Sequence, residues 1–172
     1  LLLSLQPYYE EKDVVEHGAF AGKWTSEDGE MLWEFTPKDG GYQVTINEDG
    51  KLGAFEVTPF KIGDELFLDF YPDMDTTDEM ISAFYAIHRI PTHSPMHVQT
   101  DGETPVFRAA NLDWFGDYIE ANPDAIRHEM IDDGKFPILT AQPKELQALL
   151  LKGLNEKKAF ADMKLKRAAA SE

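Results

Sequence analysis

Phe20-Ala21-Gly22-Lys23-Trp24-Thr25 is the stretch from which the fold of this chain can be argued. It stands where an N-terminal segment without clear periodicity gives way to a run of short, alternating segments. It therefore predicts the first strand of a β-domain. The segments that follow it decide what kind of sheet this strand begins.

Between Ala19 and Asn111 turn signals recur about every ten residues, as in a meandering sandwich or barrel. Asp-Gly occurs four times in this region, and each pair supplies the positive-φ residue that a tight hairpin needs. No helical period interrupts the run, which argues against a parallel βαβ sheet. The predicted strands are 20–26, 31–36, 42–47, 53–60, 65–71, 81–90, 95–100 and 105–111.

The alternation of side chains within these strands predicts which faces are buried. Trp33 and Phe35 share one face of their strand, and Tyr42 begins a clean half-buried strand. Leu66 to Tyr71 and Ile81 to Ile90 are apolar on both faces, so both should be covered on both sides. About eight strands suffice to close a sheet. The predicted fold is thus mainly β: an up-and-down antiparallel barrel of about eight strands with C-terminal helices packed on its outside.

After Asn111 the period becomes helical. Residues 112–121 form one predicted helix with Asp113 as its N-cap, and Asn122-Pro123 starts a short second one. Pro143 opens the last helix, whose leucines make an apolar stripe that we expect to cover the two-faced strands, with a continuation to Phe160 and Met163. The predicted layout is an N-terminal tether or arm (1–18), the barrel (19–112), a helical extension packed on it (113–167) and a frayed tail (168–172).

Composition excludes several classes of function. The 32 acidic and 16 basic residues give a net charge of −16, which argues against binding nucleic acid or an anionic membrane face. The absence of cysteine removes thiol nucleophiles, cysteine-based zinc sites and disulfides. No apolar run is long enough to span a bilayer, and no nucleophile-elbow or phosphate-loop motif occurs. We predict no cofactor and no catalytic residue.

Gly22-x-Trp24 on a first strand, followed by a meander and a helix after the last strand, resembles the lipocalin and wider calycin group. In that group the tryptophan closes one end of the barrel, and a basic residue of the last strand packs across it. The resemblance implies this role for Arg108, in Val106-Phe107-Arg108. A guanidinium over an indole ring contributes about 0.5–2 kcal/mol.

A second resemblance concerns the cellular compartment. Leu5 to Val14, Gly22-Lys23-Trp24 and Leu66 to Pro72 are similar to a group of uncharacterised bacterial proteins, typically predicted lipoproteins of the cell envelope. The resemblance implies a lipid-bearing cysteine before Leu1, a location on the periplasmic side of the envelope, and membrane contact only through that anchor. No activity is established for that group; the partner that we expect is a small apolar ligand or another envelope protein.

Three functional hypotheses remain open. The first is a module that binds a small apolar ligand inside the barrel, for which a pocket of about 300–1,000 Å³ is needed. The second is a structural or protein-interaction module with a filled barrel. The third is a metal-dependent enzyme built on His88, His93 and His97. The residues predicted to line the barrel interior are Trp33, Phe35, Tyr42, Phe55, Tyr85 and Phe107.

Overall fold

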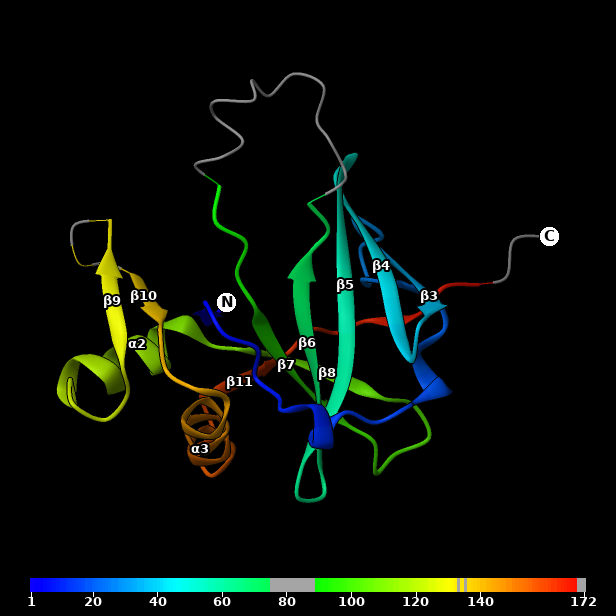
Figure 1. Cartoon of the computed structure of the whole chain (residues 1–172). Coiled ribbons are helices and arrows are strands. Elements are labelled where there is room, and N and C mark those ends of the chain that lie inside the picture. The colour runs from blue at the N-terminus through cyan, green and yellow to red at the C-terminus, as the bar shows by residue number, and fades with distance from the viewer. Residues whose placement is uncertain (75–88, 133, 135, 170–172) are drawn as a thin grey trace.

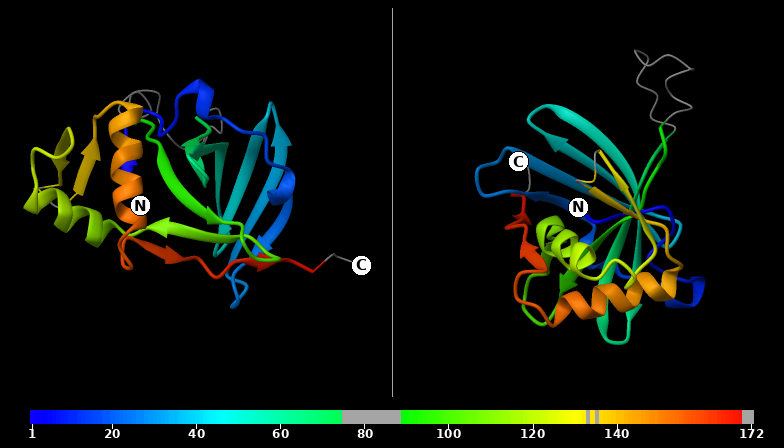
Figure 2. Two further views of the ribbon diagram at one scale, coloured as in Figure 1. Left: turned by 90° about the horizontal axis from the view of Figure 1, so that it is seen from below. Right: turned by 90° about the vertical axis from the view of Figure 1, so that its left-hand side faces the viewer.

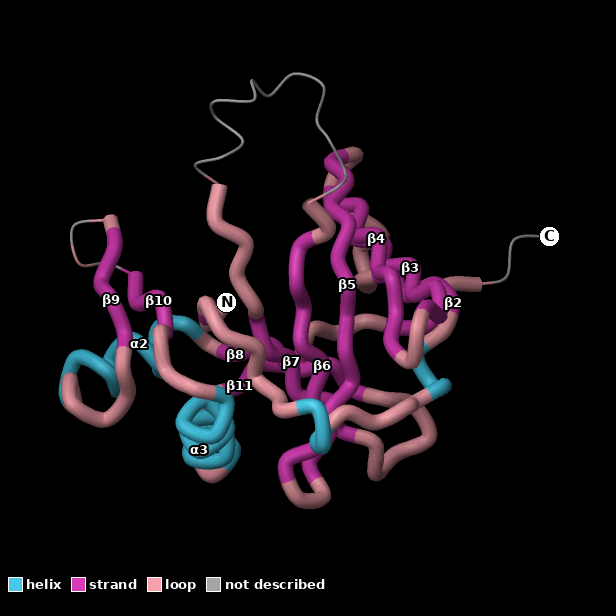
Figure 3. The backbone as a smooth tube through the Cα atoms, in the orientation of Figure 1, coloured by secondary structure: helices cyan, strands magenta, loops and turns pink. Residues whose placement is uncertain are grey.

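The computed structural model describes residues 1–74, 89–132, 134 and 136–169. In this part of the chain the protein is mainly β, with two α-helices, α2 (Leu112–Ala121) and α3 (Pro143–Leu154), and two short 3-10 helices, η1 (Glu11–Asp13) and η2 (Gly18–Phe20) (Figure 3). The strands are β1 (Leu3–Ser4), β2 (Gly22–Thr25), β3 (Met31–Lys38), β4 (Gly41–Glu48), β5 (Lys51–Ile62), β6 (Glu65–Pro72), β7 (Ser94–Gln99), β8 (Val106–Ala110), β9 (His128–Ile131), β10 (Phe136–Leu139), β11 (Phe160–Asp162) and β12 (Lys166–Arg167).

The main sheet has nine strands and curls into a half-barrel (Figures 1 and 2). Strands β2 to β8 form an antiparallel meander in sequence order. The C-terminal strands β11 and β12 add to its two ends, since β11 pairs with β8 and β12 pairs with β2. One short C-terminal segment therefore contacts both edges of the meander.

The strand count differs from the predicted eight. Seven of the predicted strands correspond to β2–β8, whereas the predicted strand 81–90 falls mostly on residues 75–88, outside the described residues. Strand β6 pairs directly with β7. The two additional strands, β11 and β12, come from the segment that was predicted to be helical. Their hydrogen bonds to the edges of β8 and β2 replace the intrahelical bonds that a continued helix would have made.

The hairpins explain why the meander forms. Asp39 and Gly40 join β3 to β4 with both residues at positive φ, 49° and 82°. Asp49 and Gly50 join β4 to β5 in the same way, at 51° and 80°. Two consecutive positive φ values are what a two-residue hairpin turn of type I′ requires. The turn prediction is confirmed at these two Asp-Gly pairs.

The sheet is buried on both faces along β6, as its sequence predicts: Leu66 to Phe70 are all buried. On the inner, concave side of β6, Leu66, Leu68 and Phe70 pack in one apolar cluster. Its outer face carries Phe67, which packs in a second cluster with residues of α2 and α3, among them Phe115 and Leu146. The predicted cover over this strand is therefore present.

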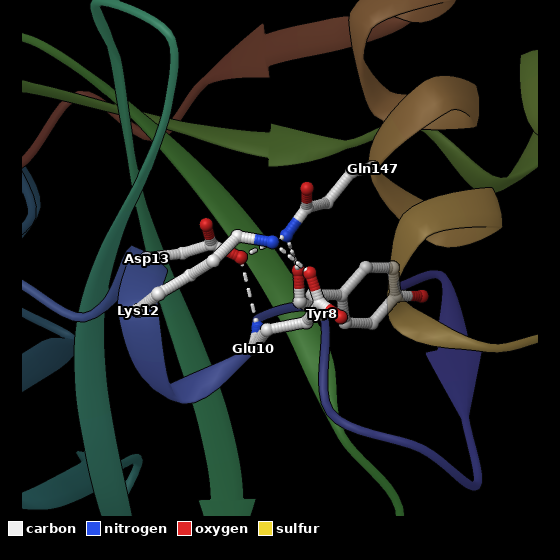
Figure 4. A network of polar contacts seen from close by, with 5 residues as sticks. All are labelled: Tyr8, Glu10, Lys12, Asp13 and Gln147. Atoms are coloured by element: carbon white, nitrogen blue, oxygen red, sulfur yellow. Dashed lines mark hydrogen bonds and ion pairs between the residues drawn. The ribbon is translucent and has the colours of Figure 1, made fainter.

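The N-terminal segment is part of this cover. Strand β1 pairs in parallel with β10, and Leu2, Ser4 and Tyr8 are fully buried. The Gln147 side chain on α3 donates to the Tyr8 carbonyl oxygen (3.1 Å) and to Asp13 Oδ2 (2.8 Å), while Lys12 pairs with Glu10 (Figure 4). Residues 1–15 thus lie along the domain as an ordered arm rather than hanging from it as a free tether.

The helices differ from prediction in placement. α2 is capped by Asn111, whose side chain accepts a hydrogen bond from the Asp113 backbone, so the N-cap lies two residues before the predicted one. The predicted short helix after Asn122 is instead a turn followed by β9, which pairs with β10. Pairing with a neighbouring strand overrides the local helix-start signal of Asn-Pro there. α3 begins at Pro143 as predicted.

Candidate ligand-binding site

The concave face of the sheet is hollowed at one end. A pocket of about 520 Å³ lies where the β4–β5 hairpin and the start of β7 meet. This volume falls within the roughly 300–1,000 Å³ of ordinary small-molecule sites. Six successive strands, β3 to β8, contribute inward-facing residues to the pocket.

The pocket wall is aromatic on one side. Trp33 on β3 and Phe70 on β6 meet edge to face, with ring centroids 5.6 Å apart. Phe55 on β5 meets Phe70 in the same way at 6.0 Å. Gly53, next to Phe55 on the inner face, adds no side chain. The rings therefore form a continuous apolar wall with free space in front of it.

Methionines make up much of the remaining wall. Met31 begins β3, Met96 lies on β7, and Met163 lies between β11 and β12. Methionine is unbranched, polarizable and adaptable, so it accommodates apolar groups of varied shape. This composition suits a ligand recognised by its apolar surface rather than by a fixed pattern of hydrogen bonds.

The pocket rim combines exposed leucines with charged groups. Leu1 and Leu52 are 61% and 72% exposed. Glu48 and Lys51 also border the pocket and are cross-strand partners in the β4–β5 ladder. Because both are exposed, their charges stay in water while the interior remains apolar.

The opposite end of the same concave face is filled. Phe20, delivered by η2, packs against Phe35, Tyr42 and Phe107 with ring centroids 5.7–6.3 Å apart. Trp24 is fully buried, meets Phe107 edge to face at 5.0 Å, and donates its Nε1–H to the Phe20 carbonyl oxygen at 2.8 Å. Trp24 thus seals this end.

The cation over Trp24 is Arg167 and not Arg108. The Arg167 guanidinium lies 4.5 Å from the Trp24 ring centroid and donates to the carbonyl oxygens of Ala19 (2.6 Å) and Ala21 (2.9 Å). Arg108 instead bonds Asp162 on β11 at 3.1 Å. The alternation explains this outcome: Phe107 points to the concave face, so its neighbour Arg108 points outward. Gly22 lies at a φ of 109°, next to the Arg167 side chain.

The predicted lining residues are divided between the two ends. Trp33 and Phe55 line the pocket, whereas Phe35, Tyr42 and Phe107 belong to the filled end. Tyr85 lies outside the described residues. The pocket is also lined by residues that were not predicted: Met31, Ile46, Met96, Ala109 and Met163. Strand alternation was the signal for the first four, and Met163 carried none because its segment was expected to be helical.

The indole N–H of Trp33 is a polar group buried in the wall of the pocket. Its Nε1–H is buried and has no hydrogen-bond partner among the described residues, although the side chain is only 4% exposed. Leaving a buried donor unpaired costs about 1–3 kcal/mol. The indole N–H in the pocket wall is therefore unpaired among the described residues, whereas the indole N–H of Trp24 at the filled end is paired.

His93 and His97 lie on the outer face and do not converge on one point. His93 Nδ1 bonds the buried Asp69 at 2.6 Å, and His97 Nε2 bonds Glu65 at 2.8 Å. Four residues along an extended chain span about 13 Å, too far for both rings to bind one ion. His88 lies outside the described residues, within which no group of three His, Cys, Asp or Glu side chains is placed to hold a metal ion.

Burial shifts the pKa values of several of these outer groups. Burial raises the pKa of Asp69 above its ordinary value, while its hydrogen bond to His93 acts in the opposite direction. The Tyr8 backbone N–H also donates to Asp69 (3.4 Å), and burial raises the pKa of the Tyr8 phenol well above its ordinary value. Burial likewise lowers the pKa of His97. These polar contacts lie on the outer face of the sheet, where they attach the N-terminal arm to β6 and attach β7 to the start of β6.

No helix in the described part of the chain has the length and apolarity needed to cross a bilayer.

No protein-family model, curated protein or solved structure matches this chain. The geometry of the pocket is therefore the main guide to function.

Proposed function

We propose that this protein binds a small apolar ligand in the pocket of its curled sheet. The observation that carries the proposal is the pocket of about 520 Å³ with walls of Trp33, Phe55, Phe70 and methionines. Each Å² of apolar surface that a ligand buries there contributes about 25 cal/mol. The charged groups stand only at the rim, which favours a ligand whose buried part is uncharged.

We further propose that the protein is a lipocalin-like module of the bacterial cell envelope. The curled antiparallel meander supports the lipocalin part, as does a basic residue of the last strand lying over Trp24. The envelope part rests on the sequence resemblance alone. Determining whether the reading frame encodes a signal sequence that ends in cysteine just before Leu1 tests it, and a frame without one contradicts it.

Ligand binding is tested with N-phenyl-1-naphthylamine, an uncharged apolar fluorophore. We expect saturable binding at one site per chain, with energy transfer from Trp33. Ala109 lines the pocket opposite Met96, so Ala109→Phe places a ring in the free space and should weaken binding about tenfold or more, the equivalent of about 1.4 kcal/mol. The measurement is a fluorescence titration of both proteins.

The matched control is Ala121→Phe, the same substitution at an exposed position at the end of α2. It should bind the fluorophore as the unmodified protein does. Absence of saturable binding, or equal affinity of the Ala109→Phe protein, would overturn the proposal. The filled-barrel interaction module would then be the better hypothesis, since half of the concave face is already solid.

A further inference from the structure

The small sheet formed by β1, β10 and β9 has one mostly buried face, on which Met130 of β9 is 45% exposed, and one more open face. Residues directly opposite each other in a ladder share a face, and alternate residues along a strand do so too. Leu2, Ser4 and Leu139 lie on the buried face. On the other face, residues 1–5 and β10 contribute only apolar side chains. Strand β9 contributes Ile131 and the acidic Glu129. We call this the apolar sheet face, and it consists of Leu1, Leu3, Leu5, Ile131, Phe136 and Ile138.

This face is unusually open to solvent. Leu1 is 61% exposed, and Leu5, Ile131 and Phe136 are each 42% exposed. Single exposed apolar residues are normal on protein surfaces, but a contiguous group of them marks an interaction site. Ile131 and Phe136 are direct cross-strand partners, and Leu3 and Ile138 are the next such pair. The register therefore makes the group contiguous.

The apolar sheet face is continuous with the pocket. Ser4 of β1 pairs with His93, the residue just before β7, so β1 lies between β10 and β7 (Figure 1). Ser4 and His93 point to the outer side, and the alternate residues point to the concave side. Leu1 belongs to both surfaces, since it also borders the pocket. Leu52, 72% exposed, stands on the pocket rim as well.

We infer that this face docks on an uncharged lipid surface, from which the pocket takes its ligand. The inference rests on the proposed function, because an apolar ligand partitions into lipid. Docking beside the pocket mouth lets the ligand pass between two apolar environments without crossing water.

Charge favours a zwitterionic surface over an anionic one. The chain carries a net charge of −16, and the charged residue on the face itself is the acidic Glu129, opposite Ile138. Repulsion from anionic lipids leaves burial of the apolar side chains as the driving force. This contact is separate from any covalent lipid anchor.

The test is flotation with phosphatidylcholine vesicles at low protein concentration. The unmodified protein should float with the vesicles. Phe136→Glu and Ile131→Glu each replace a half-exposed apolar side chain by a charge and should weaken vesicle binding about tenfold. Leu5→Glu changes the same face at the residue that follows β1, so the result does not depend on the β9–β10 hairpin alone.

Leu151→Glu is the matched control, because Leu151 is 38% exposed but lies on α3. It should float as the unmodified protein does. None of these residues lines the pocket, so all variants should keep their affinity for N-phenyl-1-naphthylamine in solution.

The outcomes separate the two proposals. Docking is overturned, and ligand binding left intact, if the unmodified protein binds the fluorophore but does not float with the vesicles. The same conclusion follows if the Phe136→Glu, Ile131→Glu and Leu5→Glu variants float as well as the unmodified protein. A dimer that Phe136→Glu converts to monomer, without flotation, assigns the face to self-association and also overturns docking. Flotation without fluorophore binding supports lipid contact but overturns ligand uptake.

Discussion

Trp24 and Trp33 lie directly opposite each other across β2 and β3, yet they stand in different environments. Both are buried, at 0% and 4% exposure. Trp24 donates its N–H to the Phe20 carbonyl oxygen and carries Arg167 over its ring. Trp33 leaves its N–H unpaired among the described residues and borders the pocket. One cross-strand pair thus marks the boundary between a filled end and a hollow end.

The strands themselves do not create this difference. On β3, β7 and β8 the inward-facing residue at one end lines the pocket and the next one along lies in the filled core. The residues that close the filled end come from outside the β2–β8 meander: Phe20 from η2 and Arg167 from the edge strand β12. The comparison indicates that stability is concentrated around Trp24, and adaptability around Trp33.

The largest expected effect tests the filled end. Trp24→Ala should lower the free energy of unfolding by about 3–5 kcal/mol, because it removes a fully buried ring and leaves a cavity. Trp33→Ala should cost less, since its ring already faces free space and loses fewer contacts. Urea denaturation of the three proteins measures both values.

A loss below about 1 kcal/mol for Trp24→Ala would show that Trp24 does not seal the filled end of the sheet, since buried aromatic truncations cost several times more. Equal losses for the two variants would contradict the division of the core into a filled and a hollow end.

The second expected effect concerns the two arginines. Arg167→Ala should destabilise the protein by about 1–2 kcal/mol, because it removes the contact with the Trp24 ring and two donors to the Ala19 and Ala21 carbonyls. Arg108→Ala should cost about 1 kcal/mol or less, because its partner Asp162 is 61% exposed.

Double-mutant cycles with Trp24→Phe distinguish the two arginines further. Coupling to Trp24 is expected for Arg167 and not for Arg108, since contacting residues couple and distant ones do not. Coupling for Arg108 alone would restore the original prediction from the sequence and contradict the observed placement of Arg167.

The sequence predicted the meander well because its signals are local. Asp39-Gly40 and Asp49-Gly50 specify hairpins through their own backbone preferences, and the doubly apolar β6 predicts its cover. It could not predict the C-terminal strands. β11 has three residues and β12 has two, too few to show a period, and their pairing with β8 and β2 is between distant segments.

The candidate site shows the same limit. Alternation correctly placed Trp33, Phe35, Tyr42 and Phe107 on one face, but it does not tell which end of that face is filled. The answer depends on Phe20, which η2 inserts between strands, and on Met163, whose segment bridges the sheet edges. Both residues come from segments without periodicity, so the sequence pattern could not predict the position of the pocket.

The smallest expected effect is that of Trp33→Phe, which we compare with Trp24→Phe to test the two indole N–H groups. Trp33→Phe removes a buried donor that has no partner among the described residues, which offsets part of the packing lost with the smaller ring. Its net effect on the free energy of unfolding should therefore stay within about 1 kcal/mol of zero. Trp24→Phe loses similar packing and also leaves the Phe20 carbonyl oxygen without its donor, so it should cost about 1–3 kcal/mol more than Trp33→Phe. Urea denaturation of both variants gives the difference, and equal costs would mean that the two N–H groups are equally satisfied. In that case the filled and hollow ends would differ in packing alone, and the unpaired Trp33 N–H would no longer distinguish them.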